Sequence, residues 1–263
     1  MPNSALPGLP NPHKYDTNVQ GVALDRVTGL MWERSPPQKF LTFEDAQRKC
    51  DDLTLAGHDD WRLPSRIELV SILDLTHIQP SIDSAIFPNT QNDWYWTSSV
   101  AAANPAAAWY VYFYFGYPKT DDKTNQFSVR CVRGTRPAPA TTAHYEIKAD
   151  EVRDVATGLL WQRKPPAKPL QFEAAGAYCG SLKLGGKKGW RIPTLPELLT
   201  LIDERALTSP MVDRAAFPET PGEPFWSSSK FGNGPDRAWY VRFDQGTGLY
   251  GRIIEPFLVR CVR

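Results

Sequence analysis

The chain contains an internal duplication that covers nearly its whole length. Three segments return almost unchanged later in the sequence: Gly29–Pro37 as Gly158–Pro166, Trp61–Pro64 as Trp190–Pro193, and Arg130–Arg133 as Arg260–Arg263. The copies lie 129 residues apart, and 130 apart after a one-residue insertion. Because solenoid units are only roughly 20–50 residues long, a repeat of this size indicates a duplicated globular domain.

The duplication predicts four parts: an N-terminal tail (residues 1–15), domain 1 (16–133), a Pro/Ala/Thr-rich linker (134–145) and domain 2 (146–263). Within each copy the pattern predicts a hairpin, two helices and a run of short strands in a small, mostly antiparallel sheet, which is an α+β fold. The second helix of each copy begins with a capping box, Ser65 to Glu68 and Thr194 to Glu197. Residues present in both copies are expected to build the fold, and residues present in one copy mark a specialised site.

The charge is distributed unequally between the two copies. The whole chain carries a formal charge of +1, which gives no strong field for nucleic acid or an anionic membrane. Residues 16–133 hold 11 basic and 15 acidic residues, a balance of −4, whereas residues 146–263 hold 17 and 14, a balance of +3. No stretch reaches the roughly 18 apolar residues of a membrane span. We therefore expect no nucleic-acid partner and no membrane span, and domain 2 is the better candidate for an anionic ligand.

Each copy contains two cysteines at matching places: Cys50 and Cys131, then Cys179 and Cys261. None has the close C-x-x-C spacing of a zinc or redox site. One cysteine of each pair ends a predicted helix and the other lies in the last strand, which suits one long-range disulfide per domain. The alternative is four buried free thiols. Because disulfides persist outside the cytosol, we expect an extracellular, periplasmic or cell-surface protein whose export signal has been removed from this chain.

Several ordered motifs in both copies together resemble a known family. They are Thr-Gly-Leu-x-Trp, a helix with a cysteine, Trp-Arg-Leu/Ile-Pro, Phe-Pro, Trp-Ser-Ser or Trp-Thr-Ser, Trp-Tyr-Val and Arg-Cys-Val-Arg. The set resembles the Lcl C-terminal domain family, a domain of unknown function in bacterial surface and secreted proteins. The resemblance implies a C-type-lectin-like architecture, related to formylglycine-generating enzymes, with the long-range disulfide of C-type lectins. It also implies adhesion, because the founding member binds sulfated glycosaminoglycans. The collagen-like stalk of that protein has no counterpart here.

No catalytic set emerges from the residues. The cluster His58-Asp59-Asp60 corresponds to Lys187-Lys188-Gly189 in the second copy, and a solvated turn explains it better than a metal site. The loop Gln91–Trp94 carries neither calcium motif of C-type lectins in full, so calcium is a minor alternative. We predict no catalytic residues, no metal and no cofactor. A formylglycine-enzyme-like oxidoreductase is the lesser alternative, and it requires a reactive cysteine.

The candidate ligand residues are those that differ between the copies. Eight of the nine tryptophans recur, and these are expected in the core; Trp94 alone has no partner. Sugar rings stack on exposed aromatic faces, whereas a Trp folded back over the core is the alternative. The predicted ligand contacts are Trp94, Tyr95, Tyr110, Tyr112 and Tyr114 in domain 1, and Lys187, Lys188, Arg242 and Arg252 as a cationic patch in domain 2.

The sequence thus favours a non-enzymatic, exported or surface-associated binding and adhesion protein that recognises glycans, including anionic ones. A protein-interaction or structural module of a bacterial surface assembly is the alternative, because the same exposed aromatic residues suit a protein partner. The sequence leaves the oligomeric state open.

Overall fold

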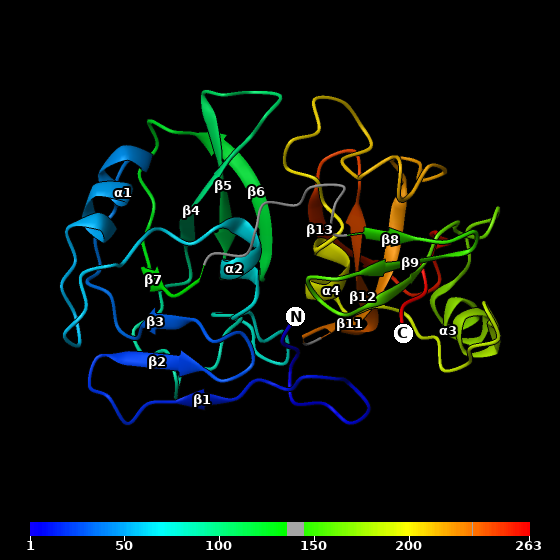
Figure 1. Cartoon of the computed structure of the whole chain (residues 1–263), viewed down its shortest axis with the longest axis horizontal. Coiled ribbons are helices and arrows are strands. Elements are labelled where there is room, and N and C mark those ends of the chain that lie inside the picture. The colour runs from blue at the N-terminus through cyan, green and yellow to red at the C-terminus, as the bar shows by residue number, and fades with distance from the viewer. Residues whose placement is uncertain (136–144, 233) are drawn as a thin grey trace. The chain divides into compact units, whose positions relative to one another are not determined.

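The structure is a computed structural model that describes residues 1–135, 145–232 and 234–263. Two compact units divide the chain, Met1–Arg136 and Pro137–Arg263 (Figure 1). We call them domain 1 and domain 2. Most of the predicted linker, residues 136–144, lies outside the described residues. No helix in the described part of the chain is long and apolar enough to cross a membrane.

Domain 1 consists of two small antiparallel sheets and two short helices. The first sheet has the order β1-β2-β3-β7 and the second the order β4-β5-β6. Its elements are β1 (Tyr15–Asp16), β2 (Val22–Asp25), β3 (Met31–Glu33), α1 (Phe43–Asp51), α2 (Arg66–Val70), β4 (Trp94–Val100), β5 (Ala107–Tyr112), β6 (Tyr117–Asp122) and β7 (Val132–Arg133).

Domain 2 repeats this arrangement with sheets of order β10-β9-β8 and β11-β12-β13. Its elements are β8 (Tyr145–Ile147), β9 (Glu151–Asp154), β10 (Leu160–Gln162), α3 (Phe172–Ser181), α4 (Leu195–Leu199), β11 (Pro224–Phe231), β12 (Gly234–Arg242) and β13 (Thr247–Arg252). Both domains are therefore mixed α+β units in tandem, with small antiparallel sheets and little helix.

Local sequence signals explain the turns and the helix starts. The Asp25 carboxylate accepts hydrogen bonds from the Val27 N–H and the Thr28 hydroxyl, and Gly29 completes the hairpin turn at φ +74°. Glycine adopts this left-handed conformation without steric cost. The two predicted capping boxes are confirmed, with Ser65 and Thr194 as N-caps of α2 and α4. These devices fix where the chain reverses and where each helix begins.

The recurring tryptophans form the core of each domain, as predicted. All eight are at most 2% exposed. On α1, Phe43 packs edge-on against Trp96 of β4 at a centroid distance of 5.8 Å. Two disulfides, Cys50–Cys131 and Cys179–Cys261, join the first helix of each domain to its last strand or segment.

A fully buried arginine ties the end of each domain to its first sheet. The Arg260 guanidinium donates to the backbone carbonyls of Gln162 and Arg163 and to the Thr220 hydroxyl. It also lies 4.6 Å from the ring centroid of Phe217. Domain 1 repeats these contacts around Arg130. The two terminal amino groups of each arginine are hydrogen-bonded, whereas its Nε has no acceptor among the described residues. Because both copies hold this arginine in the same way, it is part of the shared framework.

Candidate functional site

Aromatic side chains form a continuous, partly exposed surface on domain 1. Trp94, at the start of β4, is 40% exposed, and its ring stacks on Tyr112 at a centroid distance of 5.4 Å and an interplanar angle of 28°. Tyr112 stacks on Tyr114 at 5.7 Å and meets Phe115 and Tyr117 edge-on at 5.7 Å. We call these five residues the aromatic platform. Trp94 is thus partly exposed, and its ring also packs on the buried Phe127 at a centroid distance of 5.4 Å.

Strand register brings the platform together. Trp94 on β4 lies directly opposite Tyr112 on β5, and Tyr112 lies opposite Tyr117 on β6. Directly opposed residues of antiparallel strands place their side chains on the same face. Tyr114 and Phe115 lie in the turn that joins β5 to β6. Phe115 and Tyr117 were not predicted as members, because the turn interrupts the alternating pattern from which the other members were predicted.

Two predicted ligand contacts lie in the core instead. Tyr95 is 1% exposed and packs edge-on against Phe113 at 4.9 Å, and its hydroxyl accepts a hydrogen bond from the Gln91 backbone N–H. Tyr110 is 6% exposed because Phe127 covers it at a centroid distance of 5.1 Å. The alternation of the strand gives the correct face for Tyr110, but it cannot reveal that a later segment covers that position.

Polar groups border the platform. The Asp93 carboxylate accepts a hydrogen bond from the Trp94 backbone N–H at 2.7 Å, and partial burial raises the pKa of Asp93. Partial burial also raises the pKa of the Tyr112 phenol, and Tyr114 raises it further. The Tyr112 hydroxyl is therefore protonated at neutral pH and can donate or accept a hydrogen bond. Ring faces bordered by a carboxylate and hydroxyls suit a ligand that is apolar on one side and hydroxylated at its edge.

The equivalent positions of domain 2 carry no such platform. Pro224 lies opposite Arg242 where domain 1 has Trp94 opposite Tyr112. The Arg242 guanidinium binds both oxygens of the Asp244 carboxylate, at 2.9 and 2.7 Å. An ion pair thus takes the place of the stacked rings, and the two domains differ at this surface in chemistry rather than in backbone.

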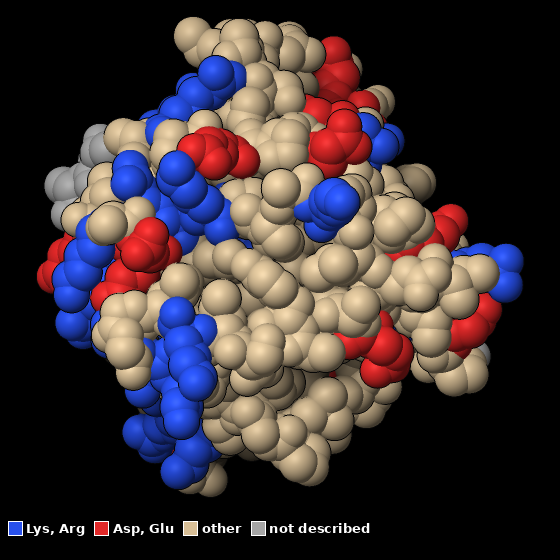
Figure 2. All heavy atoms as spheres, turned by 90° about the vertical axis from the view of Figure 1, so that its right-hand side faces the viewer, with Lys and Arg blue, Asp and Glu red and all other residues tan. Residues whose placement is uncertain are grey.

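Two of the four basic residues predicted as one cationic patch, Arg242 and Arg252, lie apart on the second sheet of domain 2. Arg252 on β13 lies opposite Arg237, near the middle of β12, whereas Arg242 is the last residue of that strand. The two positions on β12 are five residue steps apart, which corresponds to roughly 17 Å. Lys187 and Lys188 lie in the loop between α3 and α4. Figure 2 shows basic side chains gathered towards one side of a face of domain 2, with acidic side chains among them.

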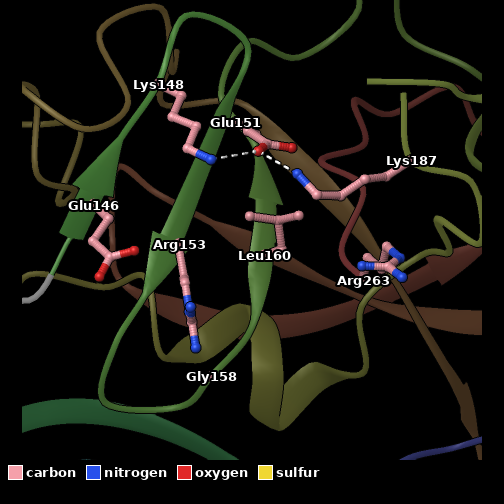
Figure 3. A pocket seen from close by; sticks show the side chains of 8 residues that line it. All are labelled: Glu146, Lys148, Glu151, Arg153, Gly158, Leu160, Lys187 and Arg263. Carbon is pink, nitrogen blue, oxygen red and sulfur yellow. Dashed lines mark hydrogen bonds and ion pairs between the residues drawn. The ribbon is translucent and has the colours of Figure 1, made fainter. Parts of the chain in front are cut away.

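Lys187 does line a pocket in domain 2 with a volume of about 260 Å³ (Figure 3). The Lys187 ammonium lies 2.5 Å from the buried Glu151 carboxylate, and Lys148 approaches the same oxygen at 3.5 Å. The hydrogen bond from Lys187 lowers the pKa of Glu151. The pocket is lined by Glu146, Lys148, Glu151, Arg153, Gly158, Leu160, Lys187 and Arg263.

Most residues of this pocket were not predicted from the sequence, although the comparison between the copies shows two changes from an aliphatic to a charged residue. Glu151 corresponds to the buried Val22 of domain 1, and Arg153 corresponds to Leu24. Both changes place a charge where the first copy has an aliphatic side chain. Such substitutions within a strand are informative because they are costly unless the position faces solvent or a ligand.

The cysteines and the acidic residues have structural roles. All four cysteines are bonded in disulfides. Within the described ranges, no three His, Cys, Asp or Glu side chains gather into a group that could hold a metal ion. Asp60, part of the His-Asp-Asp cluster, forms an ion pair with Arg133 at 2.6 Å. Duplicated carboxylates such as Glu68 and Glu197 cap helices and bind Arg62 and Arg191.

Comparison with known protein families identifies the repeated domain. Residues 21–133 and 150–263 each match the model of the Lcl C-terminal domain. The chain belongs to the Lcl C-terminal domain family. Among curated proteins, none matches the chain. Both copies of the Lcl C-terminal domain contain the disulfide, the buried tryptophans and the buried arginine, so these features belong to the framework that the copies share. The aromatic platform of domain 1 and the pocket at Lys187 in domain 2 are lined by residues that differ between the copies, and they are the candidate ligand sites.

Proposed function

We propose that this chain is a non-enzymatic carbohydrate-binding protein of the bacterial surface or exterior, and that domain 1 binds glycans on the aromatic platform. The observation that carries the proposal is the partly exposed stack of Trp94, Tyr112 and Tyr114. A pyranose ring has an apolar C–H face that packs on aromatic rings, and its hydroxyls can reach the polar groups beside them. Large aromatic side chains also provide contact area at a low cost in conformational entropy.

The remaining features support an exported binding module. Two disulfides favour a compartment outside the cytosol. The link from the first helix to the last strand agrees with a C-type-lectin-like fold, which we propose for each domain. Because every cysteine is bonded, the reactive thiol that a formylglycine-type oxidoreductase requires is missing. The residues of the aromatic platform lie on strands and in a turn at the surface, where a ligand can reach them.

Glycan-array screening of the native chain tests the proposal, followed by titration of the best ligand. Trp94→Ala is expected to weaken binding by roughly thirtyfold, since an aromatic anchor contributes about 2 kcal/mol or more. Phe40→Ala is the matched control, because Phe40 is also an exposed aromatic residue of domain 1, at 53% exposure, but lies outside the platform. This variant is expected to bind like the native chain.

Tryptophan fluorescence gives an independent readout. Trp94 is the exposed member of the nine tryptophans, so acrylamide quenching should report mainly on it, and a bound glycan should protect it. Array silence at high protein concentration contradicts the proposal. If a protein partner co-purifies and is lost in Trp94→Ala, the platform belongs to a protein-interaction module instead.

A further inference from the structure

Two equivalent arginines have different partners in the two domains. In domain 1, the Arg133 guanidinium binds both oxygens of the Asp60 carboxylate, through Nε at 2.6 Å and Nη2 at 3.2 Å. In domain 2, the counterpart of Asp60 is Gly189, and Arg263 donates from Nε to the Lys188 backbone carbonyl at 3.0 Å. No carboxylate in the described part of the chain pairs with Arg263, so its two terminal amino groups are available to a ligand.

A second arginine lies in the same row of the sheet. Arg153 on β9 is directly opposite Leu160 on β10, and Leu160 exchanges both backbone hydrogen bonds with Arg263. Such cross-strand neighbours present their side chains on one face. Figure 3 shows Arg153 and Arg263 on either side of Leu160. In domain 1 the corresponding row has Leu24 in place of Arg153, so domain 2 has gained one cation and lost the carboxylate that would neutralise the other.

The walls of the pocket combine positive charge with hydrogen-bond acceptors. Four basic and two acidic side chains line it. Lys148 and Lys187 are held by Glu151, as Figure 3 shows. Arg153 lies directly opposite the acidic Glu146 of β8, whereas the cross-strand neighbour of Arg263 is the apolar Leu160. The second oxygen of Glu151 is buried and has no hydrogen-bond donor among the described residues. That oxygen is closed to a ligand, so the pocket offers cations for an anion and the exposed Glu146 carboxylate as an acceptor for a hydroxyl group.

We propose that this pocket binds a small hydroxylated carboxylate, a sugar acid such as a hexuronate, with the ligand carboxylate on Arg263 and Arg153. The Asp60 carboxylate on Arg133 is an internal precedent for the ligand group. The planar guanidinium fork matches a carboxylate in two parallel hydrogen bonds. Leu160 supplies an apolar patch between the two arginines for the C–H face of a sugar ring.

Size and charge favour a single sugar acid over an acidic peptide. The pocket volume of about 260 Å³ lies below the roughly 300–1,000 Å³ of sites for drug-sized ligands. Glu146 and Glu151 repel a ligand with several carboxylates, and the exposed Glu146 carboxylate can accept a hydrogen bond from a hydroxyl group. The site lies in domain 2, so it does not depend on glycan binding by the aromatic platform of domain 1.

Calorimetric titration of the full chain with D-glucuronate, at neutral pH and low ionic strength, tests the proposal. Glucuronate is expected to bind saturably, and D-glucose, which has the same ring without the carboxylate, is not. Arg263→Gln and Arg153→Gln should each weaken glucuronate binding by roughly tenfold or more, because each removes charge-assisted hydrogen bonds. Arg133→Gln is the matched control and should bind glucuronate like the native chain, since Asp60 already occupies that arginine.

Several outcomes overturn the proposal. These are the absence of saturable glucuronate binding, equal binding of glucose, inorganic sulfate binding as tightly as glucuronate, or unchanged affinity in Arg153→Gln and Arg263→Gln. Circular dichroism and melting curves establish that the variants are folded. Arg153 is an exposed strand residue, so Arg153→Gln gives the result even if Arg263→Gln is unstable. Trp94→Ala should retain glucuronate binding, which separates this site from the aromatic platform.

Discussion

Removing one disulfide should destabilise its own domain by about 4.5 kcal/mol and leave the other domain unchanged. Cys50–Cys131 spans 81 residues of sequence and Cys179–Cys261 spans 82. In the chain-entropy model, a cross-link over roughly 80 residues removes about 15 cal/mol/K from the unfolded chain, or about 4.5 kcal/mol at 25 °C. Because the loops are nearly equal, the loss should be nearly equal in the two domains.

Hydrogen exchange measured by mass spectrometry resolves the two domains within one chain. The double variants Cys50→Ala/Cys131→Ala and Cys179→Ala/Cys261→Ala should each lower the protection of the slowest amides in one domain by roughly three orders of magnitude. Reduction of the native chain under native conditions is the control, because it breaks the bond without removing the sulfur atoms. A loss below about 1 kcal/mol, or equal loss in both domains from one double variant, would refute the reasoning.

Two further perturbations test the framework and the pocket wall. Arg260→Met should destabilise domain 2 by about 3 kcal/mol or more, because it leaves the buried acceptors of Gln162, Arg163 and Thr220 without a charged donor. Urea unfolding measures this loss. Arg130→Met should destabilise domain 1 by the same amount. Glu151→Gln should make the stability of domain 2 less dependent on pH in the acid range. The lowered pKa of Glu151 gives stability that is present above its unfolded pKa and is lost as pH falls through the folded value. The melting temperature of the variant should therefore fall less than that of the native chain between roughly pH 5 and pH 3. An equal fall in both proteins counts against the Glu151–Lys187 pair.

Features that depend on local sequence could be predicted. The hairpin turn at Asp25 and the capping boxes at Ser65 and Thr194 each use residues a few positions apart, so the pattern alone determines them. The pairing of Cys50 with Cys131 could be predicted because the duplication showed which cysteines belong to one domain. The recurrence of the tryptophans likewise separated the core from Trp94, because a residue that both copies retain is explained by packing.

Features that depend on which distant segments meet could not be predicted. Tyr110 and Tyr112 alternate correctly on β5, but Phe127 comes from a later segment and buries one of them. Arg153 and Arg263 lie 110 positions apart in the sequence, and only the pairing of both with Leu160 brings them into one row. Charge counts indicated that domain 2 is the more basic domain, but they carried no information on which cations are neutralised by neighbouring carboxylates.

Each copy has an arginine–carboxylate ion pair at the position where the other copy has its candidate ligand site. Domain 2 has Arg242 and Asp244 where domain 1 keeps its stacked rings, and domain 1 has Asp60 on the arginine that domain 2 leaves open. Exposed ion pairs contribute little to stability, so fold stability does not account for either pair. Under the two proposals above, each ion pair takes the place of one binding chemistry: the aromatic face is replaced in domain 2 and the open arginine is neutralised in domain 1. The duplication would then give the chain two different ligand sites rather than two copies of one site.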